Sequence, residues 1–324
     1  MINASSYSTM EMENRAFQTG TNGFVLAILS IIVFFATFSN VLIIVAFIRE
    51  RHPKNNTILV SLAVSDFGQG LFGYTPEILS EMQVVENSDT TCRVAGFSVT
   101  FLALASINHL IFLSIERAVT VVLPYFYHKF ISKSRNFVFL LVFIWLISFL
   151  FAVLPLFGVS DYKLEPDAWR CSIDWSNPSV GSKVYIISLF VFQYMVPVIV
   201  MILSFSLSNA TLTNLYQRSK ELFGKRTRSS LTFSRYELNK KYQRMVFVMV
   251  VLFLLAWTPY AVVSFLAALS VKNIPSILLT VSAVLAKSSA LFNVVVYSFL
   301  YSHFRRAVLR LITCKRVPGR PEEV

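Results

Sequence analysis

Seven long apolar runs follow one another along the chain. They extend over residues 24–48, 57–82, 93–123, 136–158, 183–208, 240–269 and 275–300. Each run can cross the hydrocarbon core of a bilayer, which takes a helix of roughly 20 residues. A spanning segment has to be helical, because lipid offers no hydrogen-bond partner to a backbone N–H or C=O group. The pattern predicts an all-α membrane protein, a bundle of seven transmembrane helices.

The polar stretches around these runs divide the chain into four parts. We expect an extracellular N-terminal tail over 1–23, the transmembrane bundle over 24–300, a short amphipathic helix over 301–314 and a cytoplasmic tail over 315–324. Asn3 opens the sequon "NAS" in the first part, so it is either a glycosylation site or a chance match.

The short helix after the seventh run is predicted from its two faces. Phe304 and Leu311 fall on one side of residues 301–314, and Arg305 falls towards the other, as in helices that lie at a membrane surface. Cys314 ends this segment and is either a lipidation site or an unmodified cysteine.

The distribution of charge predicts how the bundle is oriented. Only 14% of the 324 residues are charged, and 55% are hydrophobic, with a mean hydropathy of +0.63. Most of the 29 Lys and Arg residues lie on one side if the N-terminus is outside. The positive-inside rule therefore predicts a multi-pass protein of the cell membrane with a cytoplasmic C-terminus. The net charge of +12 is then loop charge beside anionic lipid, and it requires no nucleic acid.

Two of the three cysteines fall on the predicted outside. Cys92 opens the third run, and Cys171 lies in the loop between the fourth and fifth runs. Disulfides persist in extracellular compartments, and no other cysteine is expected on that side. We therefore predict a Cys92–Cys171 disulfide.

Lys287 lies near the middle of the last apolar run. At 1.5 Å per residue it is about 18 Å from either end, too far for its side chain to reach the headgroups. Burial disfavours the ammonium form and favours the neutral amine, which is a nucleophile towards an aldehyde. The alternative is a lysine that pairs with a buried carboxylate only for packing.

A set of residues in order along the chain resembles the rhodopsin class of G-protein-coupled receptors. These residues are Asn40, Asp66 in "SLAVSDFG", Glu116 and Arg117 in "LSIERAVTVV", Trp145, Pro197, the stretch "LAWTPYAV", and Asn293 and Tyr297 in "NVVVY". Within that class, "AKSSALFN" around Lys287 and the loop "LEPDAWRCSIDW" resemble the animal opsins. The resemblance implies that Lys287 carries retinal, 11-cis or all-trans, as a Schiff base.

The same resemblance implies which residues line the chromophore pocket and which acids could neutralise the Schiff base. Trp257, Tyr260 and Phe253 match the aromatic residues of the sixth helix, and Ala95 stands where many opsins have the glutamate that neutralises the Schiff base. Two other acids are candidates for this counterion. Glu165, six residues before Cys171, matches the loop glutamate of many invertebrate opsins. Glu77, eleven residues after Asp66, is the second, with a solvated helix end as its alternative. We rank Glu165 slightly ahead.

The cytoplasmic side both matches and departs from the family. Glu116 and Arg117 are expected to contact a heterotrimeric G protein, with Asn293 and Tyr297 as part of the switch. The departures are Ala118, Phe205, Asn239, and Val294 in place of a proline. Such departures resemble retinochromes, peropsins and other photoisomerase-type opsins, so we expect weak or constitutive coupling. An inner polar cluster of Asp66, Ser106 and Asn40 would hold either sodium or water-linked hydrogen bonds.

Two function classes remain after this comparison. The first is a light-activated receptor, and the second is a retinal photoisomerase with weak or no signalling. A receptor for a diffusible amine would need an acid where the chain has Val99. The four histidines share no ligand spacing, and we expect no metal site, no hydrolytic site and no enzyme.

Overall fold

The structure is a computed structural model that describes residues 4–49, 57–86, 88–131, 133–165, 170–223, 231–271, 274–300 and 313. Asn3 and Cys314 lie outside the described residues, as do the segments 301–314 and 315–324 apart from Thr313. The expectations for them stay predictions.

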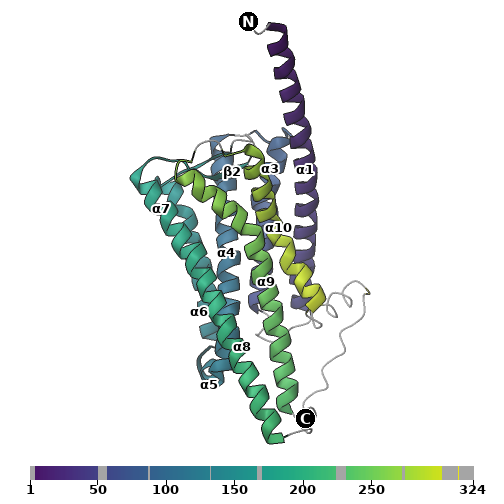
Figure 1. Cartoon of the computed structure of the whole chain (residues 1–324), viewed down its shortest axis with the longest axis vertical. Helices are drawn as coiled ribbons and strands as arrows, with labels where there is room; N and C mark the ends of the chain where they lie inside the picture. The colour runs from purple at the N-terminus through teal and green to yellow at the C-terminus, as the bar shows by residue number, and fades with distance from the viewer. Residues whose placement is uncertain are drawn as a thin grey trace.

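The expected seven-helix bundle is confirmed, and within the described ranges six helices are long and apolar enough to cross a membrane (Figure 1). The spans are α1 (Ala4–Arg49), a divided second span, α4 (Asp89–Val122), α6 (Ser134–Val153) with the short η4 (Leu154–Phe157), α7 (Val180–Phe190) continued by η5 (Val191–Met195) and α8 (Val196–Phe223), α9 (Leu231–Ala268) and α10 (Ser276–Leu300). Two short turns, α5 (Pro124–Phe126) and η3 (Tyr127–Ile131), connect α4 to α6. Helix α4 is central, because it packs against the second span and against α6, α8 and α9.

The second span is divided into three pieces, none of them long enough to cross alone. They are α2 (Thr57–Gly68), the π-helical η2 (Gln69–Tyr74) and α3 (Thr75–Glu81). Pro76 lies in the first turn of α3 and cannot donate a backbone hydrogen bond to the preceding turn. The widened turn is closed by Thr75, whose backbone N–H and hydroxyl both donate to the Gly70 carbonyl, the hydroxyl at 2.7 Å. Such π-turns are frequent at functional sites, and this one rotates the end of the span.

Several helices continue past the expected ends of the apolar runs. Helix α1 begins at Ala4, within the segment expected as a tail, and its first turns extend beyond the rest of the bundle (Figure 1). Helix α8 continues to Phe223 and α9 begins at Leu231, although the runs end at 208 and begin at 240. Hydropathy marks only the length of a helix that lies inside the bilayer, whereas the helix itself can continue beyond it.

A two-stranded hairpin covers one end of the bundle, a feature that the sequence analysis left as a loop. Strand β1 (Tyr162–Leu164) pairs antiparallel with β2 (Cys171–Ile173). The Cys92–Cys171 disulfide joins β2 to α4, and this prediction is confirmed. Gly96 permits the close approach, since a Cβ there would lie 2.6 Å from Cδ1 of Tyr162. We call this the hairpin end, and the opposite end, which carries Arg117, the Arg117 end.

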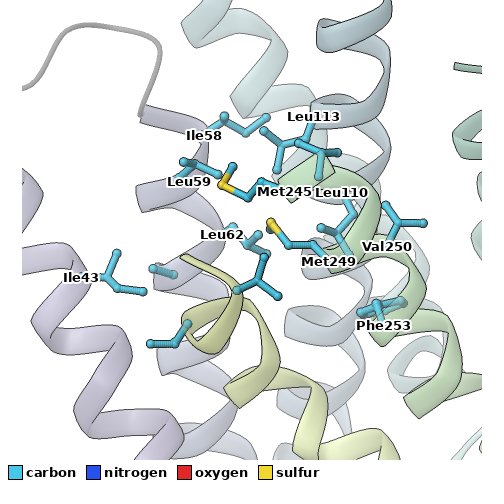
Figure 2. Close-up of a cluster of buried hydrophobic side chains, with 14 of the residues drawn as sticks. Ile43, Ile58, Leu59, Leu62, Leu110, Leu113, Met245, Met249, Val250 and Phe253 are labelled. Atoms are coloured by element: carbon cyan, nitrogen blue, oxygen red, sulfur yellow. The ribbon is translucent and has the colours of Figure 1, made fainter. Parts of the chain in front are cut away.

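Apolar side chains cover the outside of the bundle as well as its core. Phe34, Phe139 and Phe299 are 63%, 70% and 76% exposed, as expected for a surface that faces lipid. Inside, side chains from α1, α2, α4, α6, α8, α9 and α10 form one buried cluster, part of which is shown in Figure 2. The labelled members are Ile43, Ile58, Leu59, Leu62, Leu110, Leu113, Met245, Met249, Val250 and Phe253. This cluster fills the centre of the bundle and supports the cavity described next.

Candidate functional site

A cavity lies below the hairpin, with about 980 Å³ of atom-free space including its opening. Its wall comes from the second span, α4, the hairpin, η5, α9 and α10, and most of it is apolar or aromatic. Four charged side chains also line it, namely Glu77, Glu165, Arg170 and Lys287. A mostly apolar cavity with a few polar groups in fixed places is typical of a small-molecule site.

Lys287 and Glu77 meet in the wall of this cavity. The Nζ atom of Lys287 on α10 donates a hydrogen bond to Oε2 of Glu77 on α3, and the two groups form an ion pair. Glu77 is 2% exposed and Lys287 7% exposed, so each charge is compensated mainly by the other. The Lys287 Nζ also lies 4.5 Å from the centre of the Tyr74 ring, at the distance of a cation–π contact. Glu77 therefore faces the interior and is not a solvated helix end.

Glu165, which we ranked ahead of Glu77, is in a different environment. Its carboxylate forms an ion pair with the Arg170 guanidinium at 3.0 Å and accepts a hydrogen bond from the Tyr260 hydroxyl at 3.2 Å. The Glu165 backbone N–H also donates to the Arg170 carbonyl at 2.7 Å, which extends the hairpin by one pair. Sequence reasoning missed Arg170 and Tyr74. The only available signal for Arg170 was a charge directly before the bridged Cys171.

The predicted aromatic residues gather at the floor of the cavity. Trp257 donates from Nε1 to the Ser289 hydroxyl on α10 at 2.8 Å, and its ring stacks on Phe253 at 5.7 Å. Tyr260 packs edge-on against Trp257 at 6.1 Å. Ala95 is buried but does not line the cavity, because it lies beside the hairpin; Val99, one turn further along α4, lines the cavity instead.

A chain of direct hydrogen bonds leads from the cavity to the middle of the bundle. The Tyr74 hydroxyl donates to Gln69 Oε1 at 2.7 Å, and Gln69 Nε2 lies 3.3 Å from Oδ1 of Asp66. The same Asp66 oxygen accepts from the Ser106 hydroxyl at 2.8 Å, and Oδ2 accepts from Asn293 at 2.8 Å. Asp66 thus links the second span, α4 and α10 through protein side chains alone.

Asn40 occupies a separate position near this cluster. Its Nδ2 donates to the Ala290 carbonyl at 3.0 Å and ties α1 to α10, rather than to Asp66. Across the ranges that the structure describes, no three His, Cys, Asp or Glu side chains are grouped as metal ligands.

The Arg117 end holds the predicted charged pair. Arg117 Nη2 lies 2.9 Å from Glu116 Oε2, and the Tyr127 hydroxyl donates to Glu116 Oε1 at 2.8 Å. The Arg117 guanidinium stacks over the Tyr242 ring of α9 at 4.0 Å. Asn239 stands where the family often has an acid that pairs with this arginine, and sequence reasoning did not foresee the aromatic contact. Tyr297 belongs to α10, but its side chain lies outside the described residues.

Comparison with known proteins agrees with this architecture. Residues 39–297 match the family described as 7 transmembrane receptor (rhodopsin family). The chain is 30% identical over 280 residues to the green-sensitive opsin of Gallus gallus, covering 85% of this chain and 75% of that protein. It is 29% identical over 286 residues to a melanopsin of Branchiostoma belcheri, covering 86% of this chain but 40% of that longer protein.

A solved structure shares the fold. The crystal structure of squid rhodopsin superposes with a TM-score of 0.77 at 24% sequence identity, covering 91% of this chain and 87% of that one. The family match extends over most of the chain, and the opsin relatives align along nearly the whole bundle. The chain therefore belongs to the rhodopsin family of seven-transmembrane receptors and, within it, to the animal opsins.

Proposed function

We propose that this opsin is a retinal-binding photoreceptor in which Lys287 holds retinal and Glu77 is the counterion. The observation that carries the proposal is the buried contact between the Lys287 amine and the Glu77 carboxylate in the wall of an apolar cavity. A lysine kept only for packing would not need an aromatic-lined cavity around its amine.

The residues of the cavity fit retinal. The wall of the cavity is mostly apolar and aromatic, which suits a polyene, and its few polar groups lie in fixed places. The Lys287 nitrogen would form a C=N bond to the aldehyde carbon, and the carbonyl oxygen would leave as water. The bound group supplies absorption of light and isomerisation. Trp257 is held against α10 through Ser289 and would be the residue that a change of retinal shape moves first.

Glu77 is the preferred counterion, which reverses the ranking made from the sequence. A positive charge on the Lys287 nitrogen needs a nearby anion, because an unpaired buried charge costs several kcal/mol. The Glu77 oxygen already contacts this nitrogen, whereas the nearest cationic partner of the Glu165 carboxylate is the Arg170 guanidinium.

The signalling surface would lie at the Arg117 end, facing the cytoplasm. Most Lys and Arg residues of the loops fall on that side, and the disulfide and hairpin lie at the opposite end. Arg117 would contact a heterotrimeric G protein after α9 moves away from α4 and the stacking on Tyr242 is lost. We infer an outside N-terminus, which an epitope tag at either terminus, probed on intact cells, would test.

A photoisomerase-type opsin is the second candidate, and one observation favours it. Val294 replaces the expected proline, and α10 runs as one helix from Ser276 to Leu300 with Val294 buried in the core cluster. Without the proline, α10 lacks the built-in break that a missing backbone hydrogen bond provides. An unbroken α10 would make a conformational change at the Arg117 end more difficult. We therefore expect coupling to a G protein that is weak or not sharply controlled by light.

Two measurements test the proposal and separate the candidates. Purified protein is incubated with 11-cis and with all-trans retinal, then reduced with borohydride, and the modified peptide is identified by mass spectrometry. The adduct should be on Lys287 and absent from Lys287→Ala. An adduct elsewhere, or none in the wild type, would refute retinal binding at this lysine. Strong light-dependent nucleotide exchange with a silent dark state would exclude the photoisomerase candidate.

A further inference from the structure

The cavity holds four buried charges, and they are arranged as two pairs. Lys287 pairs with Glu77 across the bundle, and Arg170 pairs with Glu165 within the hairpin. All four line the same cavity, and Glu77 interacts electrostatically with both members of the second pair. Two acids therefore line the cavity that holds the Lys287 nitrogen, but their surroundings differ.

Arg170 is built into the hairpin. It is 1% exposed and precedes Cys171, whose disulfide fixes the backbone to α4. Its Nη2 lies 3.0 Å from the Glu165 carboxylate and 3.4 Å from the Thr280 hydroxyl on α10. A buried guanidinium is costly without compensation, so the Glu165 charge helps to hold Arg170 in this position.

The ion pair with Arg170 weakens the electrostatic effect of Glu165 on a distant cation. A carboxylate and a guanidinium in contact act together as a dipole, whose field falls off faster with distance than that of a single charge. Within the part of the chain that the structure describes, Lys287 is the cation that contacts the Glu77 carboxylate, and no guanidinium forms an ion pair with it. It can therefore act with its full charge on the lysine nitrogen.

We propose that Arg170 is a positioning residue that reserves Glu165 for the hairpin and thereby leaves Glu77 as the working counterion. Removing the Arg170 charge should release Glu165, which then stabilises a positive charge on the Lys287 nitrogen. The proposal rests on the proposed function, since it concerns the pigment formed at Lys287.

The test uses absorption spectra of purified, retinal-loaded protein in halide-free buffer at neutral pH. Glu77→Gln should lose the visible band and absorb in the ultraviolet. Adding Arg170→Gln to Glu77→Gln should restore the visible band, with the pH of half-conversion raised by about 1 to 3 units, as expected when an unpaired carboxylate acts on a cation. The triple variant that also carries Glu165→Gln should lose the band again. Arg170→Lys in the Glu77→Gln background is the matched control, and it should not restore the band because the positive charge remains.

The outcomes separate failure of the inference from failure of the proposed function. If Glu77→Gln alone keeps the wild-type band, Glu77 is not the counterion and the proposed role fails. If Glu77→Gln loses the band and Arg170→Gln does not restore it, Glu77 is still supported as the counterion, but the role proposed for Arg170 is overturned. Restoration that survives Glu165→Gln also overturns it, because another group must then supply the charge.

A measurement on the retinal-free protein tests the pairing without the pigment. Thermal unfolding is compared for wild type, Arg170→Gln, Glu165→Gln and the double variant. Each single variant breaks this ion pair and leaves one of its buried charges in place, so each should lower the midpoint, whereas the double variant should lose less than the sum of the two. Additive losses would refute the pairing. Arg170→Met provides a second neutral side chain of similar length if Arg170→Gln does not fold, and loss of pigment in both with Glu77 intact would overturn the proposal.

Discussion

The sharpest prediction concerns the charge on the Lys287 nitrogen after Glu77→Gln. Glutamine keeps the size of the side chain and removes its charge, so the change isolates electrostatics from packing. Glu77 is 2% exposed and Lys287 7%, so water screens this pair only weakly. Breaking a buried pair by removing one partner costs about 3–5 kcal/mol.

This free energy corresponds to a shift in the pH at which half of the Lys287 nitrogens carry a proton. Each 1.36 kcal/mol corresponds to one pH unit, so the expected displacement is about 2 to 4 pH units. The sign follows from which form Glu77 stabilises. Its carboxylate favours the positively charged nitrogen, which therefore persists to higher pH in the wild type and is lost at lower pH in Glu77→Gln. At neutral pH the variant should absorb in the ultraviolet.

The assay is a dark pH titration of the absorption band for wild type, Glu77→Gln, Glu77→Asp and Glu165→Gln, without halide. Glu77→Asp retains the charge on a shorter side chain and should shift the midpoint less than Glu77→Gln. Glu165→Gln leaves the Arg170 guanidinium without this carboxylate and should also lower the midpoint, but by less than Glu77→Gln, because Glu77 is the acid that contacts the Lys287 nitrogen. A large shift in Glu165→Gln together with a wild-type midpoint in Glu77→Gln would refute the reasoning. A wild type that absorbs only in the ultraviolet would show that the nitrogen is never charged.

Three further predictions address other parts of the bundle. Tyr242→Leu removes the ring under the Arg117 guanidinium, a contact worth about 0.5–2 kcal/mol, and should raise light-independent nucleotide exchange roughly 2- to 30-fold. Tyr242→Phe keeps the ring and should not raise exchange, and if Tyr242→Leu does not raise it either, this contact does not hold the inactive state. Cys92→Ser opens the bridge across 79 residues and should lower the unfolding free energy by about 2–5 kcal/mol, measured as a drop in the thermal midpoint that reductant reproduces in the wild type. Tyr74→Phe removes the hydroxyl that donates to Gln69 and should cost about 1–3 kcal/mol of stability, but it keeps the ring beside the Lys287 nitrogen, so the visible band should stay. If the band moves as far in Tyr74→Phe as in Tyr74→Leu, which also removes the ring, the ring and the hydroxyl do not have these separate roles.

Much of the fold could be predicted because its physical cause is local and strong. An apolar run long enough to cross lipid has one way to satisfy its backbone, and so the seven spans followed from hydropathy. The Cys92–Cys171 bridge followed from the side of the membrane on which each cysteine was expected. Lys287 was conspicuous because a charge in the middle of an apolar run is rare.

The parts that could not be predicted depend on how distant segments meet. Glu77 faces the interior because the second span widens at Gln69–Tyr74, and hydropathy does not register a π-turn. The resemblance ranked Glu165 first, because spacing from Cys171 aligns a residue but does not reveal that Arg170 is its partner. The stacking of Arg117 on Tyr242 was likewise hidden, since a search for an opposite charge on α9 does not find an aromatic partner.

The four cavity charges differ in how they respond to movement of the hairpin. Arg170 and Glu165 both belong to the hairpin, which the Cys92–Cys171 disulfide anchors to α4, so a small shift of the hairpin would carry the two charges together. Lys287 and Glu77 belong to membrane-spanning helices, so their separation is set by the packing of the bundle and would be unaffected. If Glu165 were the counterion instead, each such shift would draw the anion away from the lysine nitrogen, and separating a buried pair costs several kcal/mol. The proposed counterion on the second span would keep the charge balance at Lys287 independent of the hairpin.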